Sequence, residues 1–202
     1  LEKSDYISQV DRFVLEKTCG YIKKWCSEFP GRGILPVSVN LSRIDIYRND
    51  LCAKLSDILK KYDVPTNALH LEITESAYMD NTAVFLNTIS ELRNNGFIVE
   101  MDDFGSGYSS LNSLKDINID KLKLDMKFLS ETSETEKSKI IISAIINMAR
   151  ELKVPVIAEG VETKEQAEML MGFGCNQMQG YYFSRPVPET EYENMLCRQN
   201  SL

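Results

Sequence analysis

Predicted strands and helices alternate along almost the whole chain, and this alternation limits the possible folds more than any other feature. Short apolar runs are each followed by a longer stretch with helical periodicity. Strand–helix units joined by short links predict a parallel α/β sheet with helical crossovers. The expected strands cover 34–40, 69–74, 97–102, 119–124, 154–158 and 177–183, and the expected helices cover 5–28, 49–62, 81–94, 108–115, 136–152, 163–172 and a last segment from about 188.

Each expected strand ends in a polar residue that can bind a cation or move a proton. These residues are Asn40, Glu72, Asp102 with Asp103, Lys123, Glu159 and Gln179. An apolar strand needs no charged end in order to fold, and parallel strands place their carboxyl ends at one rim, where α/β folds carry their chemistry. Carboxylates with one amide and one lysine at such a rim predict a metal-assisted site for an anionic substrate.

Two architectures fit this pattern, an open doubly wound sheet and a (β/α) barrel. The barrel is favoured because the polar residues follow all six expected strands, whereas an open sheet concentrates its site at one switch point. A complete barrel has eight strands in about 250 residues. We therefore expect residues 1–202 to form one TIM-like barrel domain from which about two N-terminal strand units are missing.

Side-chain periodicity predicts which faces are buried. Alternation in strand 69–74 places Leu69, Leu71 and Ile73 on one face and His70, Glu72 and Thr74 on the other. We expect the apolar face to meet the helices, the polar face to look into the barrel mouth, and His70 to be a core or packing histidine. Helix 5–28 is expected to bury Val10, Phe13, Val14, Cys19, Ile22 and Trp25.

The carboxylates and the amide also have structural interpretations. Asp102 and Asp103 repel each other unless cations or hydrogen bonds offset the repulsion, but one of them could simply cap a helix. Asn40 could form a turn. Glu72 lies inside an apolar strand, where an unpaired carboxylate would be expensive. Together at neighbouring strand ends, these residues favour a metal site over separate structural roles.

The remaining strand-end residues are less specific. Lys123 could be a paired structural lysine, or it could orient a water or steady a phosphoryl oxygen. Gln179 before a glycine is typical of a strand end or a bulge. The DFGSGYSS segment after the paired aspartates could be a plain link or a loop that orders the site.

Charge and cysteine content exclude several classes of protein. The net charge of −7 argues against DNA or RNA binding, although a bound cation would admit a small phosphate-bearing ligand. The five cysteines form no CxxC pair and His70 is the only histidine, so a zinc site is not expected. We expect the cysteines to be free thiols in a reducing cytoplasm. No apolar run reaches 18 residues, so we expect no membrane segment and a cytoplasmic location.

Several segments together resemble the EAL family of cyclic di-GMP phosphodiesterases. They occur in the family's order over nearly the whole chain and are PVSVNLS, LEITES, MDDFGSGYSSL, IDKLKLD, VIAEGVET and QMQGYYFSRPVP. The resemblance implies a modified (β/α)8 barrel that hydrolyses one phosphodiester bond of cyclic di-GMP, giving linear pGpG with Mg²⁺ or Mn²⁺ as cofactor.

Residue roles follow from the same resemblance. It implies that Asn40, Glu72, Asp102 and Asp103 bind two metal ions that activate a water molecule. Lys123 would position or polarise that water. Glu159 would be a metal contact or the general base.

The resemblance also implies roles away from the metals. Gln179 would orient water or substrate, and Tyr181 would lie near a guanine. Glu75 would anchor the DFGSGYSS loop, which in this family links metal binding to dimerisation, so a homodimer is expected.

Two departures from the family pattern matter. The Glu-Ala-Leu signature is absent from these residues, so activity is expected only where a preceding segment supplies its glutamate, and the isolated chain is expected to be inactive. VNLS is followed by Arg43, Ile44 and Asp45, where relatives usually have Ala-Arg-Gln. A sensor that binds cyclic di-GMP without cleaving it and a ligand-independent interaction module are the alternatives.

Overall fold

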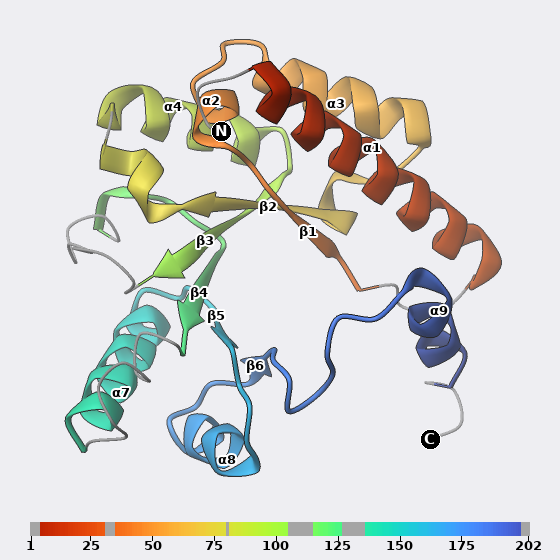
Figure 1. Ribbon diagram of the computed structural model, residues 1–202. Helices are drawn as coiled ribbons and strands as arrows, with labels where there is room; N and C mark the ends of the chain where they lie inside the picture. Colours follow the sequence, from red (N-terminus) through yellow and green to blue (C-terminus); the bar gives the residue numbers. More distant parts are fainter. Residues whose placement is uncertain (1–4, 31–34, 80, 105–114, 127–135, 199–202) are drawn as a thin grey trace.

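The computed structural model describes residues 5–30, 35–79, 81–104, 115–126 and 136–198. Within these ranges, six parallel strands form one sheet in sequence order, and the sheet curls into a half-barrel with helices on its outer side (Figure 1). The strands are β1 (Val37–Asn40), β2 (Leu69–Thr74), β3 (Ile98–Phe104), β4 (Lys121–Asp125), β5 (Val156–Glu159) and β6 (Gln177–Met178). The parallel α/β architecture predicted from the alternating pattern is confirmed.

Most of the described helices agree closely with the expected segments. They are α1 (Asp5–Glu28), α2 (Arg43–Ile46), α3 (Leu51–Tyr62), α4 (Thr82–Asn94), α7 (Glu136–Glu151), α8 (Lys164–Gly172) and α9 (Glu189–Arg198), with the short 3-10 segments η1 (Thr66–Ala68) and η2 (Glu75–Met79). The expected helix 108–115 falls mostly outside the described residues. None of the described helices is long and apolar enough to cross a membrane.

Side-chain caps explain where two of these helices begin. The Asn81 side chain accepts a hydrogen bond from the Val84 amide at the start of α4. At the start of α8, Thr163 and Gln166 form a reciprocal capping box. These caps satisfy amides that the first helical turn leaves without partners.

The alternation predicted for β2 is confirmed. Leu69, Leu71 and Ile73 have no exposed surface and belong to the core between sheet and helices. His70 and Glu72 occupy the opposite face and are buried as well. The inner face of the half-barrel is therefore a buried surface that carries charged groups.

The last strand is shorter than the sequence predicts. Only Gln177–Met178 is a strand, although the Gln179 amide still donates to the Ala158 carbonyl at 2.8 Å. At Gly180 the chain passes against the link after β5, where a Cβ would lie 2.2 Å from the Val161 carbonyl oxygen. This close approach requires glycine and turns the chain out of the sheet.

The predicted buried stripe of α1 is wrong in its first half. Val10, Phe13 and Val14 are exposed, whereas Cys19, Ile22 and Trp25 are buried as expected, together with Leu15. The buried face instead continues toward the start of the helix through polar side chains, one of which, Ser8, donates to Asp45 of α2 at 2.9 Å. Polar residues on an inward face are invisible to a search for apolar periodicity.

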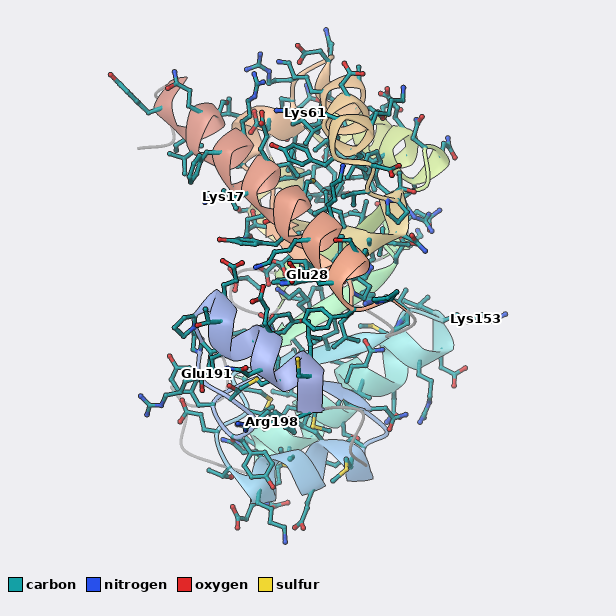
Figure 2. The ribbon with its side chains drawn as sticks, turned by 90° about the vertical axis from the view of Figure 1, so that its right-hand side faces the viewer. Lys17, Glu28, Lys61, Lys153, Glu191 and Arg198 are labelled. Carbon is teal, nitrogen blue, oxygen red and sulfur yellow. The ribbon has the colours of Figure 1, made fainter. Side chains whose placement is uncertain are left out.

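The last helix packs against the end of the first. Figure 2 shows α9 beside the part of α1 near Glu28. The Trp25 indole donates to Glu193 at 3.0 Å and its ring lies 4.7 Å from that of Tyr192. Lys24 pairs with Glu193 at 2.6 Å. Segments at opposite ends of the sequence are thereby joined.

Candidate active site at the carboxyl rim of the sheet

Strand register brings the predicted site residues to one rim. Asn40 of β1 lies opposite Glu72 of β2, and Asp125 of β4 lies opposite Glu159 of β5. Between Met101 and Phe104 the pairing of β3 with β4 is irregular, and Asp102 and Asp103 occupy this irregular stretch. The parallel strands therefore deliver polar groups to one place, as the sequence predicts.

A lysine surrounded by three carboxylates forms the centre of the site. The Lys123 ammonium lies 2.5 Å from Glu72 Oε1, 2.8 Å from Glu159 Oε1 and 3.2 Å from Asp102 Oδ1. These four residues are called the rim cluster below. Their side chains are largely buried, with exposures of 6% for Lys123, 11% for Glu72, 14% for Asp102 and 16% for Glu159.

Burial and mutual repulsion perturb the carboxylates of the rim cluster. Burial is the largest cause of a raised pKa at Glu159, which reaches about 7, and the charges of Asp102 and Glu72 raise it further against the opposing hydrogen bond from Lys123. Burial also raises the pKa of Glu72, again against Lys123. A carboxylate with a pKa near neutrality can accept or release a proton in the physiological range.

Lys123 is held in its charged form. Burial alone would lower its pKa, but hydrogen bonds to Glu159 and Glu72 outweigh burial and raise the pKa above the usual lysine value. One positive charge then faces three acidic groups. The rim cluster therefore has a surplus of negative charge, which is the condition that favours binding of a cation.

Gln179 joins the rim cluster although it lies just beyond β6. Its amide nitrogen donates a hydrogen bond to Glu159 Oε1. The tight contact of Gly180 with Val161 fixes the turn that presents this side chain. The predicted proximity of Gln179 to the site is confirmed by this bond.

The other two predicted metal ligands lie at the exposed margin of the rim cluster. Asn40 is exposed at the end of β1, where the following amide, Leu41 N–H, donates to the Glu72 carbonyl at 2.8 Å. Asp103 is exposed, has a positive φ of 54°, and its amide donates to Asp102 Oδ1 at 3.0 Å. The two aspartates are thus held in different environments, the first buried beside Lys123 and the second facing outward.

Tyr181 lies outside the rim cluster but beside a cavity that reaches it. The cavity has a volume of about 790 Å³, and Gln179, Tyr181 and Trp25 are among the residues that line it. The Arg185 guanidinium lies 5.0 Å from the centre of the Tyr181 ring. Glu75 begins η2, but its side chain and the DFGSGYSS loop from Gly105 onward lie outside the described residues, so its anchoring role stays a prediction.

A second cavity adjoins the opposite end of the rim. It has a volume of about 500 Å³ and is lined by Asn40 together with residues of α1, α2 and α3. Asp45, at the position where the family pattern is broken, lies in its wall and accepts a hydrogen bond from Ser42 at 3.2 Å. Sequence reasoning did not single out this cavity, because its residues come from segments far apart in the chain.

The donor chemistry of the site fits Mg²⁺ or Mn²⁺ ions. Carboxylate and amide oxygens are the ligands that these hard cations prefer. In the part of the chain that the structure describes, however, no group of three or more His, Cys, Asp or Glu side chains is arranged to hold a metal ion. The carboxylates converge on Lys123 instead, so metal binding requires them to turn from the ammonium toward the cation.

A second polar layer lies beneath the rim cluster, and sequence reasoning identified only its histidine. Glu100 is 1% exposed and accepts hydrogen bonds from Ser38 at 2.9 Å and from His70 Nδ1 at 2.6 Å, and Lys121 lies 3.3 Å away. These four residues are called the inner layer below. Burial opposes ionisation of Glu100, but the hydrogen bonds from His70 and Ser38 lower its pKa to about 2.

The fold and this site place the chain among α/β-barrel domains with an acidic site at the carboxyl rim. A family model described as the EAL domain matches residues 1–186, and the chain belongs to this family. The resemblance seen in the sequence motifs is thereby confirmed.

Individual relatives agree with this assignment. The chain is 36% identical to "Signaling protein YkoW" of Bacillus subtilis over 99% of this chain and 25% of that protein. It is 35% identical to "Cyclic di-GMP phosphodiesterase NbdA" of Pseudomonas aeruginosa over 96% of this chain and 25% of that protein. The chain thus spans about a quarter of the length of these curated relatives.

A solved structure extends the comparison to three dimensions. The structure titled "PaMucR Phosphodiesterase, c-di-GMP complex" superposes with a TM-score of 0.86 at 34% identity, covering 95% of this chain and 76% of that chain. The half-barrel described above is therefore the arrangement found in a phosphodiesterase of the same family.

Proposed function

We propose that this domain hydrolyses cyclic di-GMP to linear pGpG with Mg²⁺ or Mn²⁺. The observation that carries the proposal is the rim cluster, in which Lys123 lies at 2.5–3.2 Å from three carboxylates at the carboxyl rim. Relatives that share this fold are named as cyclic di-GMP phosphodiesterases. A buried group of acidic residues with perturbed pKa values is the kind of site that supports this chemistry.

In this proposal the acidic residues of the rim hold the cations. Asn40, Glu72, Asp102 and Asp103 are the metal ligands. When bound, the cations would neutralise charge on the phosphate and lower the pKa of a water molecule, so that hydroxide is available as the nucleophile. Lys123, which stays charged, orients that water or steadies a phosphoryl oxygen.

Glu159 is the candidate acceptor for the proton of the attacking water, and Gln179 orients Glu159. With a pKa of about 7, Glu159 is suited to accept a proton as general base or to contact a metal. The hydrogen bond from Gln179 fixes the orientation of the Glu159 carboxylate. The cavity beside Gln179 then receives one part of the nucleotide, and Tyr181 at its wall stacks on a guanine.

The assembly and location of the protein are part of the proposal. A homodimer is expected from the EAL family resemblance, and the molar mass from light scattering tests this expectation. A cytoplasmic location of the domain is expected because its substrate is an intracellular second messenger, and it is measured by fractionation.

The experiment measures turnover of cyclic di-GMP by a protein that contains these residues together with the preceding segment expected to supply the signature glutamate. With Mn²⁺ present, we expect pGpG to appear on anion-exchange chromatography, and chelation with EDTA should abolish it. Glu72→Gln should lose activity, while the exposed surface variant Glu136→Gln is the matched control and should retain it. Absence of pGpG under these conditions contradicts the proposal.

A second candidate function is binding of cyclic di-GMP without cleavage. The observation that favours it is that, among the described residues, no group of three or more His, Cys, Asp or Glu side chains is arranged to hold a metal ion. Calorimetry with cyclic di-GMP distinguishes the two functions, because a sensor binds the nucleotide and leaves it intact. Neither binding nor turnover would leave an interaction module as the remaining function.

A further inference from the structure

We infer that Glu100 is a positioning residue that holds the strands carrying the rim cluster in the correct register along their axes. This inference rests on the proposed function, since it concerns the same metal site. Each residue of the inner layer lies two positions before a predicted site residue on the same strand: Ser38 before Asn40, His70 before Glu72, Glu100 before Asp102 and Lys121 before Lys123.

The Glu100 carboxylate on β3 is contacted from three other strands, the adjacent β2 and β4 and, beyond β2, β1. Ser38 of β1 donates to Oε2, and His70 of β2 and Lys121 of β4 contact Oε1. With 1% of its side chain exposed, Glu100 has almost no access to water as a substitute partner. A shift of any one strand along its axis would break one of these contacts inside the barrel, where the loss is costly.

Backbone pairing alone does not fix this register beside Asp102. Pairing of β3 with β4 is regular at Glu100–Lys121 and at the next pair, and it becomes irregular between Met101 and Phe104. Asp102 lies in this irregular stretch and Lys123 lies across from it. The Glu100–Lys121 ion pair therefore lies one residue pair before the point where the strands lose their regular register.

A purely structural role predicts something different. Buried ion pairs often add little to the free energy of unfolding, because desolvation offsets the attraction. If the inner layer served only stability, its removal would change the melting temperature and leave the site unaffected. A positioning role instead predicts weaker metal binding and slower chemistry in a protein that remains folded.

The test measures Mn²⁺ affinity by calorimetry, together with kcat, KM and the melting temperature, in the protein that carries these residues. Glu100→Gln keeps the size of the side chain but replaces one acceptor by a donor that faces other donors. We expect its Kd for Mn²⁺ to rise about tenfold and its kcat to fall by a similar factor, with KM for cyclic di-GMP unchanged because both cavities are intact.

The matched control removes an ion pair at the amino-terminal end of the strands, opposite the carboxyl rim. Arg93 pairs with Asp120, just before β4 begins, at 2.8 Å. Arg93→Gln should lower the melting temperature and leave the Mn²⁺ Kd and kcat at wild-type values. If Glu100→Gln behaves like Arg93→Gln, the positioning role is overturned.

A second variant and a wild-type measurement decide the remaining cases. If Glu100→Gln does not fold, the triple variant His70→Leu, Glu100→Met, Lys121→Met replaces the layer by apolar side chains that a core can accept. A folded triple variant with unchanged Mn²⁺ affinity overturns the inference, and one with weakened affinity supports it. Absence of Mn²⁺ binding in the wild type rejects the metal site itself, and is thereby distinguished from failure of the positioning role.

Discussion

The rim cluster and the inner layer use the same kinds of residue on the same face of one sheet, with opposite electrostatic balance. At the rim, three carboxylates share Lys123. One layer below, three donors share Glu100. The pKa of Glu159 is raised to about 7 and that of Glu100 is lowered to about 2, although both are glutamates of one sheet with side chains no more than 16% exposed.

This difference shows that burial of charge does not by itself mark a functional site. A carboxylate whose hydrogen bonds are all supplied by the protein is stable as it is. A group of carboxylates with too few positive partners costs free energy, and such local conflict is expected where a ligand completes the arrangement. The rim cluster has this conflict and the inner layer does not.

The largest expected effect separates the buried Lys123 from the partly exposed Lys121. Lys123→Met should reduce turnover at least about a thousandfold, because it removes the ammonium that lies beside the three carboxylates and the group that steadies the phosphoryl oxygen. Lys121→Met, its counterpart one layer below, should reduce turnover only about tenfold. Initial rates with cyclic di-GMP measure both, and equal losses would remove the distinction between the layers.

Stability of the metal-free protein should respond to pH in opposite ways at the two layers. The raised pKa of Glu159 gives stability that is present below about pH 4.5 and lost as the pH rises through about 7, a loss of up to about 3 kcal/mol. The lowered pKa of Glu100 gives stability that is present above about pH 4.5 and lost as the pH falls through about 2.

Chemical unfolding across this pH range checks both slopes. Glu159→Gln should remove the loss on the neutral side, and Glu100→Gln should remove the loss on the acid side. A metal-free wild type whose stability is flat from pH 5 to pH 8 would show that the rim carboxylates are not in conflict.

Metal addition should relieve the conflict at the rim alone. At a Mn²⁺ concentration of about 100 times Kd, binding to the folded state stabilises it by about 2.7 kcal/mol. Thermal melts at pH 8 with and without Mn²⁺ measure this shift, and Ca²⁺ provides a cation of different size as a comparison. Glu72→Gln should show little shift, whereas a full shift in that variant would place the metal elsewhere.

The smallest effect concerns the cavity beside the rim cluster. Tyr181→Ala should raise KM for cyclic di-GMP about tenfold by loss of stacking on a base, with kcat nearly unchanged. The control is Phe183→Ala. Phe183 is also an exposed aromatic residue, and its ring centre lies 5.1 Å from that of Tyr182. A changed kcat with unchanged KM in Tyr181→Ala would assign this tyrosine to the chemistry instead.

Strand alternation allowed much of the architecture and of the rim cluster to be predicted from sequence. Glu72 was identified because it lies inside an apolar strand, where an unpaired charge is expensive, and Lys123 because it lies near the end of an expected strand. Asp102 was identified by its neighbour Asp103, and Gln179 as a strand-end residue before a glycine. The structure brings Glu72, Asp102, Lys123, Glu159 and Gln179 together, as their positions at strand ends predict.

What sequence could not supply is the pairing between strands. Glu100 also interrupts an apolar strand, but its meaning depends on His70 and Lys121, which the fold brings beside it from other segments. The early end of β6 was missed because the contact between Gly180 and Val161 is tertiary. The polar inward face of α1 was missed because Asp11 and Ser8 meet partners on α2 instead of an apolar core.

The packing of α9 on α1 gives the molecule a built-in optical probe. Trp25 is the single tryptophan of the chain, 7% exposed, and it lines the cavity that also contains Gln179. Its indole is held against Tyr192 and Glu193 of α9. Intrinsic emission from this one residue therefore reports on occupation of that cavity and on detachment of the last helix without any added dye.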